Sequence, residues 1–265
     1  MKITVFTSNQ PRDLHLIDRL AEIADECYAV IETNTVFPGK IQGFFQKSEV
    51  FQQYFSNVIE SEKKIFGSIR FSENIKNLII QSEDLNNLDI ETLKPALDSD
   101  IYIVFGSSYI KGWLIDHLIS NNAINIHMGI SPYYRGSSCN FWALYDYNPH
   151  LMGATIHMLS RGLDSGKILY HIAPTTKNCI NPFDFTMMSV KSAHVSLVKR
   201  ISSGEINKYN PVSQNSNLEV RYAKNSDFTD EVAKEFLDRN MSIEDIESLI
   251  NKKFNQIDYI EPFIY

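Results

Sequence analysis

The sequence predicts an α/β fold in which a mostly parallel, twisted sheet carries helices on both faces. Short apolar segments typical of buried strands alternate along the chain with longer amphipathic segments typical of helices. The composition is that of an ordinary globular protein, since 43% of the 265 residues are hydrophobic and 22% are charged. Strands that alternate with helices favour a parallel sheet, because each helix provides the crossover that two parallel strands require. We therefore expect a Rossmann-like arrangement, with ligands at the carboxyl ends of the strands.

The first part of the chain contains the elements of a βαβ unit. Residues 2–7 have the apolar character of a buried strand, residues 14–24 have the periodicity of an amphipathic helix with Asp13 as its cap, and residues 28–32 form a second strand. A long helical stretch follows over residues 41–66. We expect its aromatic side chains to face the core or a partner subunit: Phe44, Phe45, Phe51, Tyr54, Phe55 and Phe66.

Strands and helices continue to alternate up to Gly204. The pattern predicts strands over residues 77–81, 101–105 and 123–127, and helices over residues 90–97, 110–120 and 183–202. Beyond Gly204 the composition changes, because residues 207–217 are rich in Asn and Ser, and two short helices are predicted over residues 227–239 and 242–251. We therefore divide the chain into a main domain (residues 1–204) and a C-terminal appendage (residues 205–265).

Two polar side chains near the middle of the chain suit acyl transfer. Asn125 and His127 lie two positions apart on a predicted strand, so both side chains point to the same face. A neutral His can accept a proton from an attacking nucleophile, an Asn amide can stabilise a developing oxyanion, and a nearby carboxylate can orient the imidazole. The chain has no Gly-x-Ser-x-Gly turn, and Cys139 lacks the sequence setting of a nucleophile. We therefore expect direct attack by the acceptor, without an acyl-enzyme.

The motifs around these residues occur in a specific order. Asn125-x-His127 is followed by Ser-Pro-Tyr-Tyr-Arg-Gly over residues 131–136, by Trp142, by Gly-Ala-Thr-Ile-His over residues 153–157, and by Leu-Asp-Ser-Gly over residues 163–166. Over residues 1–200 the chain resembles the folate-dependent formyltransferase family, which includes enzymes that act on glycinamide ribonucleotide, methionyl-tRNA and sugar nucleotides. The main domain is then the formyltransferase catalytic domain.

The resemblance assigns the catalytic Asn, His and Asp of that family to Asn125, His127 and Asp164. Two departures from the family pattern are visible. Residues 129–132 are Gly-Ile-Ser-Pro where the family usually has Ser-Leu-Leu-Pro, and Cys139 replaces a frequent proline. Neither departure changes a chemical group of the trio.

The resemblance also implies N10-formyltetrahydrofolate as the co-substrate. Its expected contacts are on the loop after residues 101–105 and on the loop that leads to Asp164, namely Gly106, Ser107, Ser108, Tyr109, Ile110, Lys111, Arg161 and Gly162. Backbone groups of such loops can pair with the pterin edge. Taken alone, Gly106-Ser-Ser is more typical of a simple strand-to-helix turn. No Gly-x-Gly-x-x-Gly follows the first strand, which argues against a dinucleotide cofactor.

We expect no metal site. His127, His157 and Asp164 are conceivable ligands, but the chain has no His-Glu-x-x-His motif and no paired cysteines. His157 and His171 are expected on strands beside the Asp164 loop, as structural residues. The three cysteines are scattered, which argues against a disulfide framework and for the reducing cytoplasm.

The acceptor amine has several candidates. The chain has a net charge of −7, and residues 206–265 carry 7 basic and 11 acidic side chains, a net −4. Neutralisation of phosphates supplies most of the affinity for nucleic acids, so a nucleic acid partner is not expected, although net charge can hide a local basic patch. Glycinamide ribonucleotide enzymes typically consist of the catalytic domain alone, which leaves a nucleotide-linked amino sugar. The resemblance is greatest to the GDP-perosamine type, which formylates a 4-amino-4,6-dideoxy sugar for the O-antigen of lipopolysaccharide.

Candidate contacts to such a substrate are Asn9, Arg12, Tyr134, Arg135, Gly136 and Trp142. Arg12, Arg135 and Lys40 are candidates for a pyrophosphate, although Arg135 can equally anchor its own loop. Two other classes stay open, a hydrolase that deformylates the same folate and a binding protein without catalysis. The first residues lack the apolar region of a signal peptide, and no segment approaches the about 18 apolar residues of a membrane span, so we expect no membrane insertion. The resemblance implies a homodimer.

Overall fold

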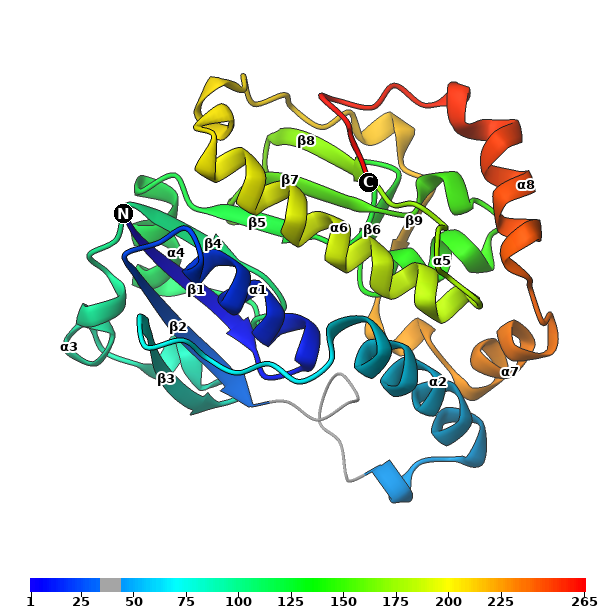
Figure 1. Cartoon of the computed structure of the whole chain (residues 1–265), viewed down its shortest axis with the longest axis horizontal. Helices are drawn as coiled ribbons and strands as arrows, with labels where there is room; N and C mark the ends of the chain where they lie inside the picture. Colours follow the sequence, from blue (N-terminus) through cyan, green and yellow to red (C-terminus); the bar gives the residue numbers. More distant parts are fainter. Residues whose placement is uncertain (34–43) are drawn as a thin grey trace.

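The computed structural model describes residues 1–33 and 44–265. Its centre is a twisted sheet of eight strands in the order β10-β8-β7-β5-β4-β1-β2-β3 (Figure 1). Its strands are β1 (Lys2–Ser8), β2 (Glu26–Thr33), β3 (Ile75–Gln81), β4 (Ile101–Val104), β5 (Ile124–His127), β7 (Ala154–Met158), β8 (Ile168–Ala173) and β10 (Phe263–Ile264). Two short strands, β6 (Tyr134–Gly136) and β9 (Arg221–Ala223), form a separate parallel pair.

Strand direction changes across the large sheet. From β3 through β2, β1 and β4 to β5, all neighbours are parallel. β7 runs antiparallel to both β5 and β8, and β10 is parallel to β8. The predicted mostly parallel sheet is therefore confirmed. The reversal after β5 has a local consequence, because it places His157 of β7 directly opposite Asn125 of β5.

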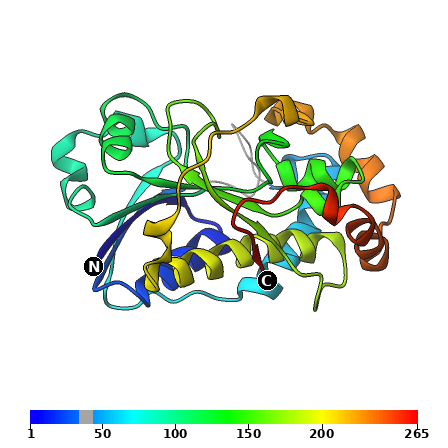
Figure 2. The ribbon, with the colours of Figure 1, turned by 90° about the horizontal axis from the view of Figure 1, so that it is seen from above.

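Helices cover both faces of the sheet, as Figure 2 shows. α1 (Pro11–Ala21) and α6 (Pro182–Ser202) lie on one face, and α3 (Ile90–Leu93) and α4 (Gly112–Ser120) lie on the other. Successive side chains of β1 alternate between the two layers. Ile3 and Val5 join the core beneath α1 and α6, whereas Phe6 joins the core beneath α4. The prediction of helices on both faces is confirmed.

A second core lies at one end of the sheet. It is enclosed by α2 (Glu49–Phe66), α5 (Cys139–Tyr145), α7 (Asp230–Asp238) and α8 (Ile243–Lys253). Its centre is aromatic, with the ring of Tyr54 4.9 Å from that of Phe228 and 5.8 Å from that of Phe141. Tyr54, Phe55 and Phe66 are buried, as predicted for aromatics that face the core, but Phe45 is 88% exposed.

Two predicted helix starts are wrong. α1 begins at Pro11, and Asp13 lies inside its first turn, where its carboxylate accepts a hydrogen bond from the backbone N–H of Gln10 (3.2 Å). The predicted helix over residues 41–66 is interrupted, because Phe44–Gln46 form a 3₁₀ helix and α2 begins only after Ser48. The Ser48 hydroxyl accepts from the N–H of Phe51 (3.2 Å) and so fixes the start of α2. Residues 41–43 lie outside the described residues.

The predicted helix over residues 90–97 is also divided. α3 ends at Leu93, and Lys94–Ala96 form a 3₁₀ helix that contains Pro95, whose missing N–H cannot continue an α-helix. The other predicted elements are present, with ends that differ by at most three residues. The pattern gave no sign of α5 or of the short strands β6, β9 and β10.

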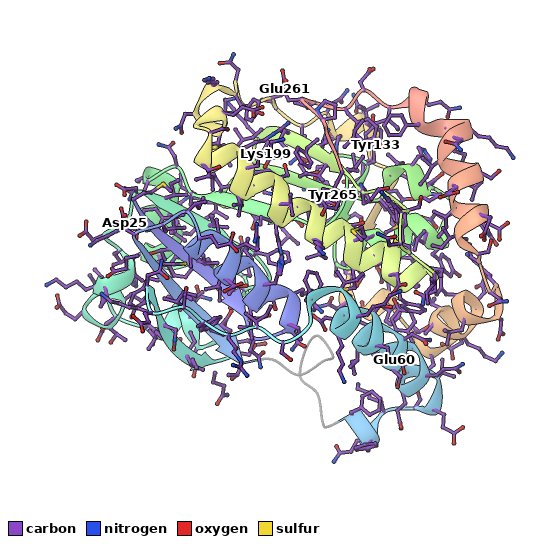
Figure 3. All side chains as sticks on the ribbon, viewed as in Figure 1. Asp25, Glu60, Tyr133, Lys199, Glu261 and Tyr265 are labelled. Atoms are coloured by element: carbon purple, nitrogen blue, oxygen red, sulfur yellow. The ribbon has the colours of Figure 1, made fainter. Side chains whose placement is uncertain are left out.

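The residues after Gly204 pass back over the rest of the chain. β9 pairs with β6, α7 contacts α2, and β10 adds to the large sheet beside β8. Figure 3 labels Glu261 and Tyr265 on the last segment, which runs beside α6 near Lys199. There the guanidinium of Arg200 donates to the carbonyl of Glu261 (3.0 Å). The division at residues 204 and 205 stays a prediction. Among the helices of the described ranges, none is long and apolar enough to cross a membrane.

Candidate active site

The site is built at the end of β5, where the parallel part of the sheet meets its antiparallel part. Asn125 and His127 are held there by pairing with β7 on one side, and Asn125 also pairs with Val104 of β4 on the other. Ile126, between them, is buried in the core with a 4% exposed side chain. The third residue, Asp164, comes from the loop between β7 and β8. The structure therefore brings together the three residues that the motifs singled out.

Both ring nitrogens of His127 face hydrogen-bond acceptors. Nδ1 lies 3.3 Å from Oδ2 of Asp164, and Nε2 lies 3.1 Å from the backbone carbonyl of Tyr134. A carbonyl oxygen and a carboxylate can only accept, so the imidazole satisfies both only when both nitrogens carry a proton. Burial by itself lowers the pKa of His127, but the charge on Asp164, with a smaller contribution from Cys139, raises that pKa well above its ordinary value of 6.5. The geometry and the electrostatics agree on an imidazolium.

Asp164 completes this ion pair from a strained backbone. Its φ is +47°, in the left-handed region that residues other than glycine rarely adopt. Burial raises the pKa of its carboxyl, but the charge on His127 and the hydrogen bond to it, with smaller contributions from His157 and the Gly136 backbone, bring the pKa below its ordinary value of 3.8. Asp164 is thus a carboxylate that opposes a buried cation.

His157 belongs to the same network, although the sequence suggested a purely structural role. Its Nδ1 donates to the carbonyl of Met158 (2.9 Å), so its Nε2 is free of a proton and accepts from the Asn125 amide at 3.0 Å. Burial lowers the pKa of His157 to about 4, which keeps this ring neutral. The neutral ring therefore fixes the orientation of the Asn125 amide. His157 lies opposite Asn125 on an antiparallel neighbouring strand. The sequence could not predict this contact, because a sequence does not reveal which strands pair.

The first loop predicted to contact folate is fixed by a buried carboxylate. Glu32, at the end of β2, is fully buried and accepts from the Ser108 N–H (2.5 Å), the Ser108 hydroxyl (2.8 Å) and the Glu83 N–H (2.8 Å). Gly106 has a φ of +68°, and a Cβ there would lie 3.2 Å from the Asp13 carboxylate. Sequence reasoning missed Glu32, because a Glu at the end of a strand is ordinarily exposed.

The two loops predicted to contact folate touch each other. The half-exposed Tyr109 donates its hydroxyl to the carbonyl of Arg161, and the guanidinium of Arg161 pairs with Asp116 (2.6 Å). The backbone N–H of Lys111 donates to Asn86 (2.7 Å). The side chain of Ile110 is buried in the core beneath α4, so a contact of this residue with folate stays a prediction for its backbone groups. The remaining residues of this set are Ser107 and Gly162, which lie at or near the surface.

Two predicted substrate contacts are corrected. The side chain of Tyr134 is fully buried, and its hydroxyl donates to Asp146 (3.1 Å) and accepts from Asn148 (3.0 Å). Trp142 is 2% exposed and lies beneath the guanidinium of Arg221, 4.4 Å from its ring centroid. Neither aromatic side chain can reach a substrate, since both serve to pack β6 and α5.

The predicted cationic contacts have carboxylate partners within the protein. Arg12 pairs with the buried carboxylate of Glu62 (2.9 Å). Arg135 pairs with Glu219 (3.1 Å) and donates to the carbonyl of Leu163 (3.2 Å), as expected of a residue that anchors a loop. Asn9 is half-buried, Gly136 lies against β9, and Lys40 lies outside the described residues.

A surface cavity of about 380 Å³ adjoins the Asp164 loop. It is lined by Pro132, Arg135, Ser165, Lys167, Ser213, Gln214 and Ser216. Two cations and three hydroxyls face this space, and Ser165 directly follows Asp164. These groups suit an anionic ligand. Within residues 1–33 and 44–265, no group of three or more His, Cys, Asp or Glu side chains is arranged to hold a metal ion.

Comparison with known proteins agrees with this geometry. The sequence matches the family model described as formyl transferase over residues 1–178. No curated protein sequence gives a significant match. A solved 4-N formyltransferase from Francisella tularensis is 20% identical with a TM-score of 0.50, and the match covers 86% of this chain and 77% of that one.

Two further solved structures share the fold. The formyltransferase PseJ from Anoxybacillus kamchatkensis, in complex with UDP-4,6-dideoxy-4-formamido-L-AltNAc and tetrahydrofolate, is 15% identical with a TM-score of 0.50, covering 93% of this chain and 97% of that one. Glycinamide ribonucleotide transformylase 1 from Symbiobacterium toebii is 15% identical with a TM-score of 0.50, covering 77% of this chain and 88% of that one. Because the family model spans residues 1–178 of 265, the chain belongs to the formyl transferase family.

Proposed function

We propose that this protein transfers the formyl group of N10-formyltetrahydrofolate to the amine of a nucleotide-linked 4-amino-4,6-dideoxy sugar, with GDP-perosamine as the first candidate. The observation that carries the proposal is the buried His127 imidazolium, held 3.3 Å from Asp164 beside the oriented amide of Asn125. Such fixed donors stabilise the negative oxygen that forms when an amine attacks a formyl carbon. The product would serve the O-antigen of lipopolysaccharide.

The mechanism assigns one role to each residue of the trio. The uncharged sugar amine attacks the formyl carbon, and the resulting oxyanion is stabilised by the Asn125 amide and by the charge on His127. His127 then gives a proton to N10 of the departing tetrahydrofolate and regains one from the newly acylated nitrogen, so one proton passes from amine to folate in each turnover. This differs from a neutral His127 that starts as a base, because both of its nitrogens already face acceptors. Asp164 supports the imidazolium throughout.

The two ligands are assigned to different ends of the Asp164 loop. We place folate beside residues 106–111, where Tyr109 contacts Arg161 at the start of that loop. We place the diphosphate of the nucleotide sugar in the cavity lined by Arg135 and Lys167, beside the end of the same loop. The formyl carbon and the amine would then meet at the trio. Replacement of Lys167 by Ala should raise the KM for the nucleotide sugar more than the KM for folate.

A sugar acceptor is supported by the extent of the structural likeness. PseJ, whose complex contains a 4-formamido sugar nucleotide, matches 93% of this chain, whereas the glycinamide ribonucleotide enzyme matches 77%. The residues after Gly204 supply Ser213, Gln214 and Ser216 to the cavity, so a catalytic domain alone would lack part of this site. A homodimer and a cytoplasmic location stay part of the proposal, and the three cysteines are unpaired.

The test is incubation of the protein with N10-formyltetrahydrofolate and GDP-, UDP- and dTDP-linked 4-amino sugars, followed by mass spectrometry. We expect one member of the panel to gain a single formyl group, and His127→Asn to abolish that gain while the protein remains folded. Consumption of the folate without formylation of any sugar would replace the proposal with hydrolysis or with another amine acceptor. Near-native turnover of His127→Asn would show that formyl transfer does not require His127.

A further inference from the structure

We propose that Gln214 is a positioning residue for catalysis, which holds the Asp164 loop so that the Asp164 carboxylate faces His127. It acts from a segment outside the predicted catalytic domain, residues 212–223, which we call the strap. The inference rests on the proposed function only in so far as the Asp164–His127 pair is catalytic. The position of the pair itself can be measured without any substrate.

The side-chain amide of Gln214 contacts the Asp164 loop directly. Its Nε2 donates one hydrogen bond to the carbonyl of Asp164 and another to the carbonyl of Gly166, both at 2.8 Å. The amide thus uses both of its N–H groups on the backbone of one turn. Gln214 is half-buried, whereas each of its neighbours over residues 211–220 is exposed. The strap turns this one side chain inward, onto the loop that carries the carboxylate.

The Asp164 loop needs such support because its conformation is unfavourable by itself. Asp164 has a φ of +47°, and a side chain in the left-handed region is disfavoured by contact with its own backbone. A residue in this conformation persists only when its surroundings hold it there. The two bonds from Gln214 fall on Asp164 itself and two residues beyond it, so they oppose relaxation of this φ.

The strap is in turn fixed to the core at both ends. Val212 exchanges two backbone hydrogen bonds with Ile168 of β8, each 2.8 Å long. At the other end, β9 pairs with β6, and only a glycine at 136 permits this approach, because its φ is +84° and a Cβ would lie 2.1 Å from the carbonyl oxygen of Ala223. Gly136 of the Arg-Gly motif therefore has a packing role toward the strap.

A second tie joins the strap to the same loop. Glu219 of the strap pairs with Arg135 (3.1 Å), and Arg135 donates to the carbonyl of Leu163 (3.2 Å). Leu163, Asp164 and Gly166 are thus all held through their carbonyls by the strap or by its partner. The consequence is that a change in the strap should alter the distance between Asp164 and His127 without removing either residue.

The test compares Gln214→Met with Asn217→Ala. Methionine keeps the length of the side chain and removes both donors, while Asn217 is an exposed residue of the same strap and provides the matched control. The pKa of His127 is measured by NMR of protein with isotope-labelled histidine, with the His127→Asn spectrum for assignment. We expect Gln214→Met to lower the pKa of His127 and to lower kcat by about tenfold to a hundredfold, with the KM for the folate within about twofold. Asn217→Ala should change neither.

The possible outcomes separate this inference from the proposed function. An unchanged pKa of His127 in Gln214→Met would overturn the inference, whatever happens to turnover, because the pair would then be held without Gln214. A lowered pKa supports it even if no amine in the substrate panel is formylated, since the titration needs no substrate. Equal melting temperatures of the two variants would show that a loss of kcat does not come from unfolding.

Discussion

The replacement Asp164→Asn removes one charge from the buried pair and keeps the shape of the side chain. The two side chains are 5% and 12% exposed, so solvent screens their interaction only weakly. At an effective dielectric constant of about 20, unit charges separated by the observed 3.3 Å attract each other by about 5 kcal/mol before the cost of burial is subtracted. In the variant that attraction is lost and burial remains, so we expect the pKa of His127 to fall below its ordinary value of 6.5.

The assay is the pH dependence of formyl transfer. At neutral pH His127 of the variant is uncharged, and we expect kcat to fall by about a hundredfold to a thousandfold, the usual effect of losing one oxyanion donor. Activity should recover in part at acid pH, where His127 takes up its proton again. The matched control is Asp116→Asn, which removes an exposed carboxylate that pairs with Arg161 of the same loop. A variant that lost activity equally at every pH would refute an essential imidazolium.

The same variant reports on stability. His127 has a raised pKa in the folded state. Its contribution to the free energy of unfolding is therefore complete below pH 6.5 and is lost as pH rises through the folded pKa. Asp164 has a lowered pKa, so its contribution is complete above pH 3.8 and is lost as pH falls through the folded pKa. The difference in unfolding free energy between wild type and variant should therefore be largest between pH 3.8 and pH 6.5. Urea unfolding across this range measures it, and a difference independent of pH would contradict the ion pair.

Three further substitutions test other parts of the site. Asn125→Ala removes the oriented amide and should lower kcat by about a hundredfold to a thousandfold with little change in KM, as steady-state kinetics will measure. Tyr109→Phe removes the hydroxyl that donates to Arg161, and the loss of one hydrogen bond of about 0.5–1.5 kcal/mol should raise the KM for the folate by about two- to tenfold. Glu32→Gln places an amide N–H among three donors, so the free energy of unfolding in urea should fall by about 1–3 kcal/mol. Unchanged stability there would mean that Glu32 does not fix the Ser108 loop.

The layout of the sheet was predictable because strands that are buried on both faces can be recognised from the apolar residues in their sequence. Ile101–Val104 is a continuous apolar run, and Ile3, Val5 and Phe6 are the apolar residues of Lys2–Ser8. The amphipathic segments between such strands predict covering helices. Elements of two or three residues, such as β6, β9 and β10, leave no comparable pattern. Their backbone partners lie far along the chain, as for Gly136 and Ala223. These short strands therefore form because of that pairing and not because of the local strand propensity of their residues.

The trio was predictable from its motifs, but the groups that orient it were not. His157 acts on Asn125 through strand pairing, Glu32 acts on Ser108 across 76 residues, and Gln214 acts on Asp164 across 50. None of these residues stands in a motif with its partner. Tyr134 and Trp142 show the opposite error, because they lie within a motif and yet are buried. A motif therefore indicates that its residues matter, but it does not distinguish residues that contact the substrate from residues that support the backbone of the site.

The surroundings of His127 also limit which of its protons can be transferred. The proton on Nδ1 faces the Asp164 carboxylate, and its release would break the ion pair that stabilises the ring. The proton on Nε2 faces the neutral carbonyl of Tyr134, at 3.1 Å, and not the Asp164 carboxylate, so a reacting atom can compete for it at lower cost. That carbonyl belongs to β6, which β9 of the strap holds in place. The strap therefore supports both nitrogens of the ring, Nδ1 through Gln214 and Asp164, and Nε2 through β9 and β6. In the proposed mechanism, a C-terminal segment that contributes no member of the trio would thus position the proton that the trio transfers.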